Sequence, residues 1–97
     1  MAYYFLAQIK VNDPDTYQKY INGAREVFSR YNGQYLAVDE KPQILEGSWN
    51  YTKSVIIRFP SEEDFKMWYT SSEYQELLRF RLSAAQCDTI LVKGLDV

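Results

Sequence analysis

Two hydrophobic periods alternate along this chain, and each change of period marks a boundary between a strand and a helix. Residues 3–11 alternate with a period of two, which predicts a strand. From Pro14 to residue 31 the apolar positions recur three or four residues apart, which predicts an amphipathic helix. Asp13 is a suitable N-cap for this helix, and Asn32 with Gly33 is a suitable stop. The apolar helix positions are Tyr17, Tyr20, Ile21, Ala24, Val27, Phe28 and Tyr31.

The second half of the chain repeats this order of elements. Residues 34–38 have the pattern of a short strand, and residues 53–59, rich in β-branched side chains, that of a longer one. A helical region begins at Ser61 and is interrupted around residues 70–72, where hydroxyl side chains compete for backbone hydrogen bonds. A new helix follows, capped by Ser72 with Gln75 or alternatively by Ser71. Its apolar stripe contains Tyr74, Leu77, Leu78, Arg81, Leu82 and Ala85, and residues 89–93 have the pattern of a last strand.

The order strand, helix, strand, strand, helix, strand indicates the fold class. It divides into two βαβ-like halves, and right-handed crossovers then bring all four strands into one sheet. We therefore expect an α+β, ferredoxin-like sandwich in which a four-stranded antiparallel sheet carries its helices on one face. Residues 1–97 form a single domain in this prediction, because the chain is short and shows no internal linker.

Both faces of the predicted sheet are apolar. One face would carry Phe5, Ile9, Val55 and Ile57, and the other Tyr4, Leu6, Ile56 and Leu91. The helices can cover only one face, whereas the open face of an antiparallel sheet is normally polar. We therefore predict a homodimer in which two copies pack through their open sheet faces. The alternative is that the second apolar set consists of scattered surface residues.

Composition favours self-association and argues against several other classes of protein. A domain of 97 residues is marginally stable as a monomer. There is no histidine and one cysteine, Cys87, so an internal disulfide is impossible and no metal or other cofactor is predicted. The 11 basic and 13 acidic residues are interspersed, which argues against a nucleic-acid partner. No apolar run is long enough for a membrane span and no secretory signal is visible, which predicts a cytoplasmic protein.

Arg81 is the leading candidate for chemistry because it falls on the apolar stripe of the last helix. A buried guanidinium needs an ion-pair partner, an exit to solvent or a bound anion. The structural interpretation is a salt bridge to Glu46, Asp88 or another acid. The functional interpretation is an anchor for a carboxylate or an enolate. Glu46, followed by Gly47, is in turn an ion-pair partner, a turn residue or a general base.

Aromatic side chains provide the remaining candidates. Tyr17, Tyr20, Trp68 and Tyr69 could line a ligand-binding cleft between the helices and the sheet. At helical spacing the same residues are also expected in a hydrophobic core. The predicted ligand-binding set is therefore Arg81, Glu46, Tyr17, Trp68 and Tyr69, and no catalytic residue is assigned.

Several short motifs occur in a fixed order along the chain: DPDTY at residues 13–17, LEGSW at 45–49, FPS at 59–61, YTSSEYQ at 69–75, and then Arg81. Together they resemble the DUF1330 family, a family of unknown function in the dimeric α+β barrel superfamily. The resemblance covers nearly the whole chain and implies a ferredoxin-like protomer that forms a homodimer through its sheet. Ser72 departs from the pattern, because the family often has proline there. The family supplies no established catalytic residues.

Three classes of function fit these features. The chain could be a cofactor-independent enzyme acting on a small carboxylate or aromatic metabolite in the helix–sheet cleft, by analogy with related barrels. It could instead bind such a small molecule in the same cleft without catalysis. The alternative is a structural or interaction dimer that has no ligand. A cleft that contains Arg81 and another polar group favours the first two classes, and a fully paired Arg81 favours the third.

Overall fold

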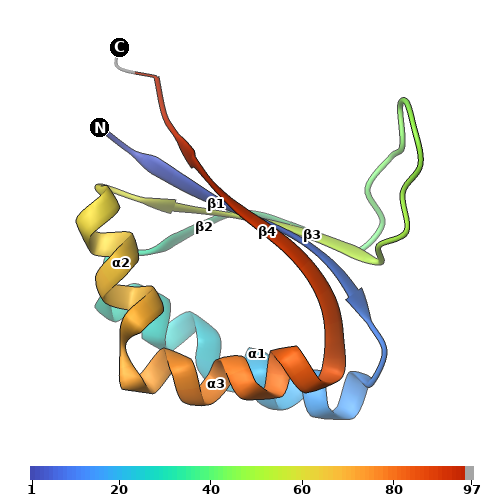
Figure 1. The fold of residues 1–97 in the computed structure, drawn as a ribbon, viewed down its shortest axis with the longest axis horizontal. Helices are drawn as coiled ribbons and strands as arrows, with labels where there is room; N and C mark the ends of the chain where they lie inside the picture. The colour runs from blue at the N-terminus through green and yellow to red at the C-terminus, as the bar shows by residue number, and fades with distance from the viewer. Residues whose placement is uncertain (96–97) are drawn as a thin grey trace.

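The elements follow one another in the order that the two hydrophobic periods predict. The computed structural model describes residues 1–95. The elements are β1 (Tyr3–Val11), α1 (Pro14–Arg30), β2 (Gln34–Asp39), β3 (Lys53–Phe59), α2 (Glu62–Thr70), α3 (Ser72–Ala84) and β4 (Ala85–Lys93). Figure 1 shows the helices on one side of the sheet, while the β2–β3 connection extends away from the other side.

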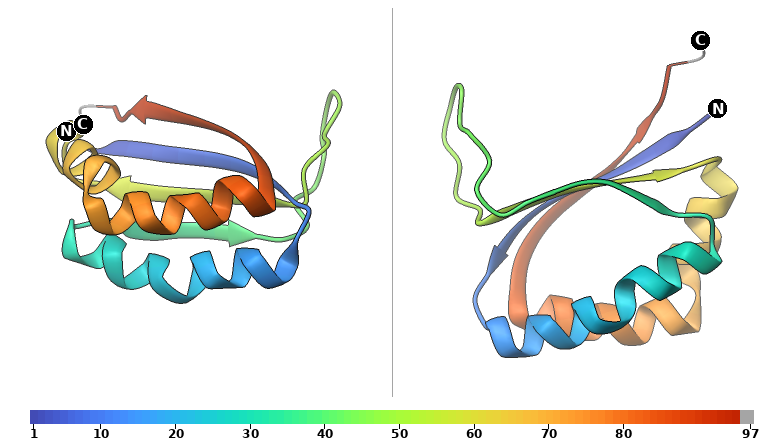
Figure 2. Two further views of the ribbon diagram at one scale, coloured as in Figure 1. Left: turned by 60° about the horizontal axis from the view of Figure 1, so that its bottom comes forward. Right: turned by 180° about the vertical axis from the view of Figure 1, so that it is seen from behind.

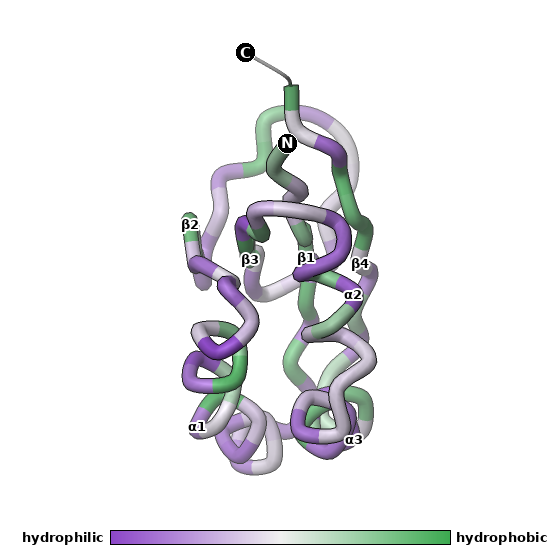
Figure 3. Tube along the Cα trace, turned by 90° about the vertical axis from the view of Figure 1, so that its left-hand side faces the viewer, coloured by the Kyte–Doolittle hydropathy of each residue, from purple (hydrophilic) through white to green (hydrophobic). Residues whose placement is uncertain are grey.

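The four strands form one antiparallel sheet in the order β2-β3-β1-β4. The strands can be followed in that order across the end view of Figure 3, with the helices in a separate layer below them. Both views of Figure 2 agree that α1 and α3 run along the same face. This is the ferredoxin-like arrangement, so the predicted fold class is confirmed. No helix within residues 1–95 combines the length and the hydropathy that a membrane span requires.

Local signals fix both ends of α1. Asp13 caps its first turn, as predicted. At the other end Asn32 adopts a left-handed backbone conformation with φ of 65°. The backbone N–H of Gly33 donates to the carbonyl of Phe28 at 2.7 Å, and that of Asn32 donates to Ser29 at 3.3 Å. These two bonds form a Schellman motif, which satisfies carbonyls that the helix leaves free and turns the chain toward β2.

Serine caps separate α2 from α3. The Ser61 hydroxyl accepts from the backbone N–H of Asp64 at 3.1 Å, as the sequence predicts. For α3 the cap is Ser71, whose hydroxyl accepts from the backbone N–H of Tyr74 at 3.1 Å. The sequence allowed either Ser71 or Ser72, and the structure selects Ser71. Ser72 is instead the first residue of α3.

The last strand is longer than its sequence pattern predicts. It begins at Ala85 rather than at residue 89, directly after α3, and Ala85 lies opposite Val11 of β1. The ladder with β1 supplies hydrogen-bond partners all along this segment, and such pairing overrides its weak local pattern. The predicted helical stripe is wrong in its last two members, because Ala85 belongs to β4 and Leu82 is 65% exposed.

The open face of the sheet is apolar, but its members differ from those predicted. Leu91 lies opposite Phe5, which places it on the helix-covered face. Ile90 and Val92 occupy the open face instead, 59% and 38% exposed. The three other predicted members, Tyr4, Leu6 and Ile56, are half-buried on that face. A shift of one residue in the assumed register of β4 explains the error, because successive side chains point to opposite faces.

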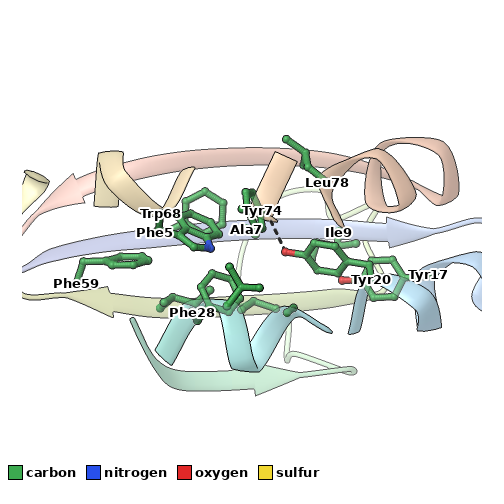
Figure 4. Close-up of a cluster of buried hydrophobic side chains, with 14 of the residues drawn as sticks. Phe5, Ala7, Ile9, Tyr17, Tyr20, Phe28, Phe59, Trp68, Tyr74 and Leu78 are labelled. Carbon is green, nitrogen blue, oxygen red and sulfur yellow. Dashed lines mark hydrogen bonds between the residues drawn. The ribbon is translucent and has the colours of Figure 1, made fainter. Parts of the chain in front are cut away.

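Aromatic rings fill much of the space between the sheet and the helices. Trp68 is fully buried, and its ring centroid lies 4.0 Å from that of Tyr74, 4.6 Å from Phe28 and 5.2 Å from Phe59. In Figure 4 this group lies toward one end of the interface, and the tyrosines of α1 lie toward the other. The rings that pack around the Trp68 indole therefore fill one end of the helix–sheet interface, and the tyrosines of α1 lie at the other end.

Candidate functional site: a cationic cavity under the sheet

A cavity of about 520 Å³ lies between α1 and the helix-covered face of the sheet. Its apolar wall comes mainly from alternate residues of the two central strands. The apolar lining includes Phe5, Ala7, Ile9, Val55, Ile57 and Phe28. Its polar lining consists of Tyr17, Tyr20, Asn22, Arg25, Tyr35, Lys53 and Arg81. The cavity therefore combines an apolar bed with polar groups from α1, β2, β3 and α3.

Three cations of this lining each stand over a tyrosine ring of the same lining. The pairs are Arg81 with Tyr20 at 5.8 Å, Lys53 with Tyr17 at 5.0 Å and Arg25 with Tyr35 at 5.5 Å, each measured from the charged group to the ring centroid. Such contacts stabilise a cation only modestly and leave its N–H groups available to other partners. No aspartate or glutamate of residues 1–95 lines the cavity. The cavity is therefore electropositive.

Arg81 is 3% exposed and has no carboxylate partner within residues 1–95. Its Nε is buried without a hydrogen-bond partner among the same residues. Neither acid suggested by the sequence reaches it. Glu46 is exposed in the β2–β3 connection. Asp88 lies opposite Gln8 on the open face of the sheet, where it accepts a hydrogen bond from the Tyr51 hydroxyl. The salt-bridge interpretation of Arg81 is therefore wrong for these two acids.

The tyrosines around Arg81 do not supply the missing negative charge. Burial raises the pKa of Tyr17, Tyr20 and Tyr74 above the ordinary value of a phenol, so all three stay neutral at physiological pH. The hydroxyls of Tyr20 and Tyr74 are 3.0 Å apart and hydrogen-bond to each other, as the dashed line in Figure 4 shows. Among residues 1–95, therefore, no negative charge compensates that of the guanidinium.

Lys53 is the second buried cation, with 8% of its surface exposed. Burial lowers the pKa of its amine below the ordinary value, and the charge of Glu40 partly opposes this shift. Lys53 also lines a neighbouring cavity of about 320 Å³, which shares Tyr17 and Ile21 with the first. Glu40 lines only that second cavity. Lys53 therefore stands where the two cavities adjoin.

The structure brings together two of the five residues in the predicted ligand-binding set, because Arg81 and Tyr17 both line the cavity. Trp68 lies in the aromatic core, and Tyr69 packs beside it with ring centroids 5.6 Å apart. Neither is part of the cavity wall. Glu46 is remote in the exposed connection. Three predicted residues therefore lie outside the cationic cavity: Trp68 and Tyr69 because they pack in the aromatic core, and Glu46 because it lies in the exposed β2–β3 connection.

Sequence reasoning missed Lys53 and Arg25. A signal for Lys53 was present, because it shares the period-two face of Val55 and Ile57, both of which point under the sheet. Arg25 gave no such signal, since it is exposed at the edge of the apolar stripe of α1. Within residues 1–95, moreover, no three histidine, cysteine, aspartate or glutamate side chains gather into a group that could hold a metal ion.

The fold and this helix–sheet cavity define an α+β protein of the ferredoxin-like class. Residues 2–95 match the family described as a domain of unknown function, DUF1330, and the chain belongs to this family. The resemblance that the short motifs suggest is therefore confirmed. None of the curated proteins is similar enough to match the chain.

Solved structures of low sequence identity share this fold. A protein of unknown function from Rhodopseudomonas palustris is 19% identical with a TM-score of 0.83, over 99% of this chain and 84% of that one. SnoaB, a cofactor-independent oxygenase from Streptomyces nogalater, is 11% identical with a TM-score of 0.68, over 99% and 95%. A dimeric ferredoxin-like protein of unknown function from Thermobifida fusca is 16% identical with a TM-score of 0.68, over 94% and 89%. At these identities the likeness concerns the fold alone.

Proposed function

We propose that this protein binds a small organic anion, with a carboxylate head and an apolar or aromatic body, in the cavity between α1 and the sheet. The observation that carries this proposal is Arg81, a buried guanidinium with no carboxylate partner among the described residues. Leaving a buried charge unpaired costs several kcal/mol, about as much as a strong ligand contact returns. A carboxylate in the cavity would supply the missing charge and form two parallel hydrogen bonds with the guanidinium.

The size and lining of the cavity favour the same class of ligand. Small-molecule sites usually have volumes of about 300–1,000 Å³ with mostly apolar walls and a few polar groups. The cavity, at about 520 Å³, lies within this range. Phe5 and Phe28 belong to the apolar wall that an aromatic or aliphatic body would contact, while Arg25 and Lys53 extend the positive field around the head. A dimer without a ligand is the less favoured function, because it gives no role to an unpaired Arg81.

A titration of matched acids and amides tests the proposal. We expect 3-phenylpropionate and related aryl carboxylates to bind and to raise the thermal midpoint, whereas 3-phenylpropionamide, which has the same shape without the charge, binds at least about tenfold more weakly. Isothermal titration calorimetry and thermal shift assays measure both effects, and native mass spectrometry of the purified protein would reveal a co-purified acid. Equal binding of acid and amide, or no binding by a panel of aryl and alkyl carboxylates, would contradict the proposal.

We further propose that the protomer forms a homodimer through the open face of its sheet. The apolar side chains on that face, Ile90 and Val92 among them, support this, as does the description of structural neighbours as dimeric. Two sheets that pack face to face would cover both apolar surfaces at once. The cytoplasmic location and the absence of a nucleic-acid partner stay predictions.

Light scattering tests the dimer. We expect a mass of about twice 11.5 kDa at micromolar concentration, and a shift toward one protomer for Ile90→Glu, because two copies of an unpaired carboxylate would be buried at the interface. Leu82→Glu is the matched control, since Leu82 is 65% exposed on α3, away from the sheet. A wild-type mass of 11.5 kDa would show that the open face is solvated, while a dimeric Ile90→Glu variant would place the interface elsewhere.

A further inference from the structure

Lys53 differs from the other lysines of the chain in its surroundings. Of the six lysines it is the one that is buried, whereas Lys10 is half-buried and the others are exposed. Its Nζ stands 5.0 Å from the centre of the Tyr17 ring, and no carboxylate forms an ion pair with it within residues 1–95. Lys53 lines both cavities, so a molecule bound in either would lie next to its side chain. A buried lysine at a cavity wall without a salt bridge needs an explanation other than packing.

The environment of Lys53 favours the neutral, nucleophilic form of an amine. Burial lowers the pKa of the Lys53 amine, because the charged form loses its hydration at this cavity wall. Glu40, the acidic group that acts on it, works against this shift. Lowered pKa values from apolar burial or neighbouring cations are how enzymes activate lysines toward carbonyl groups.

We propose that Lys53 forms a Schiff base with the aldehyde or ketone of an organic acid whose carboxylate is held by Arg81. This inference rests on the proposed anion-binding function and adds a covalent step to it. Two tyrosine rings connect the two cations along the cavity wall. The ring of Tyr17 lies next to Lys53, the ring of Tyr20 lies next to Arg81, and the two ring centroids are 5.6 Å apart. An aryl body packed along these rings would direct a carboxylate toward one cation and a carbonyl toward the other.

The step needs no oxidant, reductant or metal. The lone pair of the Lys53 amine forms a bond to the carbonyl carbon, and the electron pair of the carbonyl π bond moves to oxygen. This oxygen takes up the proton that the nitrogen loses, which gives a carbinolamine. A further proton, taken from solvent, then lets the hydroxyl leave as water, and the nitrogen lone pair closes the C=N bond to give an iminium ion. The iminium can draw electrons from an adjacent bond. When it returns its N–H proton to solvent, the net change is amine plus carbonyl to imine plus water.

Reductive trapping tests the inference directly. The probes are 4-formylbenzoate, its neutral match 4-formylbenzamide, and the longer 4′-formylbiphenyl-4-carboxylate, each incubated with the intact protein and sodium cyanoborohydride. We expect one adduct by intact mass, mapped to Lys53 by peptide analysis. At least one formyl acid should label Lys53 about tenfold or more faster than the amide does. It should also label Lys53 about tenfold or more faster than it labels any exposed lysine. The reason is that only a formyl acid at Lys53 has both anchors, the Arg81 guanidinium for its carboxylate and the Lys53 amine for its carbonyl. The rate should rise with pH at first, as more of the Lys53 amine loses its proton, and then fall, because loss of water from the carbinolamine requires a proton.

Three variants make the result specific. Lys53→Met, which keeps an apolar stem at the cavity wall, should abolish the adduct while far-UV circular dichroism stays unchanged. Lys41→Met, at an exposed lysine, should react like the wild type. Arg81→Met should lower the rate with formyl acids by about tenfold, toward the rate of the amide. Labelling spread over the exposed lysines, or equal labelling of Lys53 by acids and amide, would overturn the inference.

The same reagents separate a failure of the covalent step from a failure of the proposed function. Binding of a formyl acid is measured first, without reductant, and adduct formation is measured after reduction. Equal binding to wild type and to Lys53→Met, with no adduct, would show that the anion site exists and that Lys53 is not a nucleophile. No binding and no adduct with either formyl acid would contradict both. Titration calorimetry and intact mass on one sample give the two readouts.

Discussion

Arg81→Met is expected to increase the free energy of unfolding of the ligand-free protein while it removes binding of aryl carboxylates. The guanidinium is 3% exposed, lacks a carboxylate partner within residues 1–95 and has an unsatisfied Nε. Methionine would fill similar space without a charge to desolvate. Replacing a buried charge by an apolar side chain can stabilise a protein by about 1–4 kcal/mol. Loss of the contact with the Tyr20 ring, worth about 0.5–2 kcal/mol, offsets part of that gain.

Urea unfolding at a fixed protein concentration measures this prediction, since a dimer unfolds in a concentration-dependent way. Arg79→Met is the matched control, because Arg79 is exposed on the same helix and should change stability by less than about 0.5 kcal/mol. We expect a net stabilisation of about 1–2 kcal/mol for Arg81→Met, together with loss of the calorimetric signal for 3-phenylpropionate. A destabilisation beyond about 2 kcal/mol would instead assign Arg81 a structural role.

Trp68→Ala should destabilise the protein severely, because it removes the largest fully buried side chain of the described residues. The ring centroid of Trp68 lies within 6 Å of those of Phe5, Phe59 and Tyr74, among others. Its removal would leave a cavity that rigid neighbouring rings cannot fill, which costs about 3–5 kcal/mol. The total stability of a small domain is about 5–15 kcal/mol. We therefore expect the midpoint of thermal unfolding to fall by about 15 °C or more.

Far-UV circular dichroism is the suitable probe for Trp68→Ala, because the substitution itself removes one of the two tryptophans. Met67→Ala is the control, since Met67 precedes Trp68 in α2 but is 57% exposed and should be nearly neutral. A loss below about 1 kcal/mol for Trp68→Ala would mean that the aromatic core readily collapses around the gap. Anion binding should survive in the fraction that stays folded, because Trp68 does not line the cavity.

Local physical rules account for most of what the sequence predicts correctly. The change between periods of two and three to four residues follows from backbone geometry alone, so it locates six of the seven elements closely. Caps such as Asp13 and Ser61 depend on hydrogen bonds to residues three positions away. The position of Arg81 on the buried face of α3 follows from the same helical spacing. None of these features requires knowledge of distant parts of the chain.

Features that depend on distant segments were decided only by the tertiary structure. Pairing with β1 set the true length of β4 and moved Leu91 to the covered face, because hydrogen-bond register joins residues far apart in sequence. The meeting of Arg81, Lys53 and Arg25 depends on how α3, β3 and α1 lie over one another. The same arrangement keeps Glu46 away from Arg81. The sequence alone thus determined the elements, the fold and one buried cation. Tertiary packing brought three cations together in a cavity that no carboxylate of residues 1–95 lines. The sequence could not predict this cavity, because hydrophobic periodicity does not encode distances between elements.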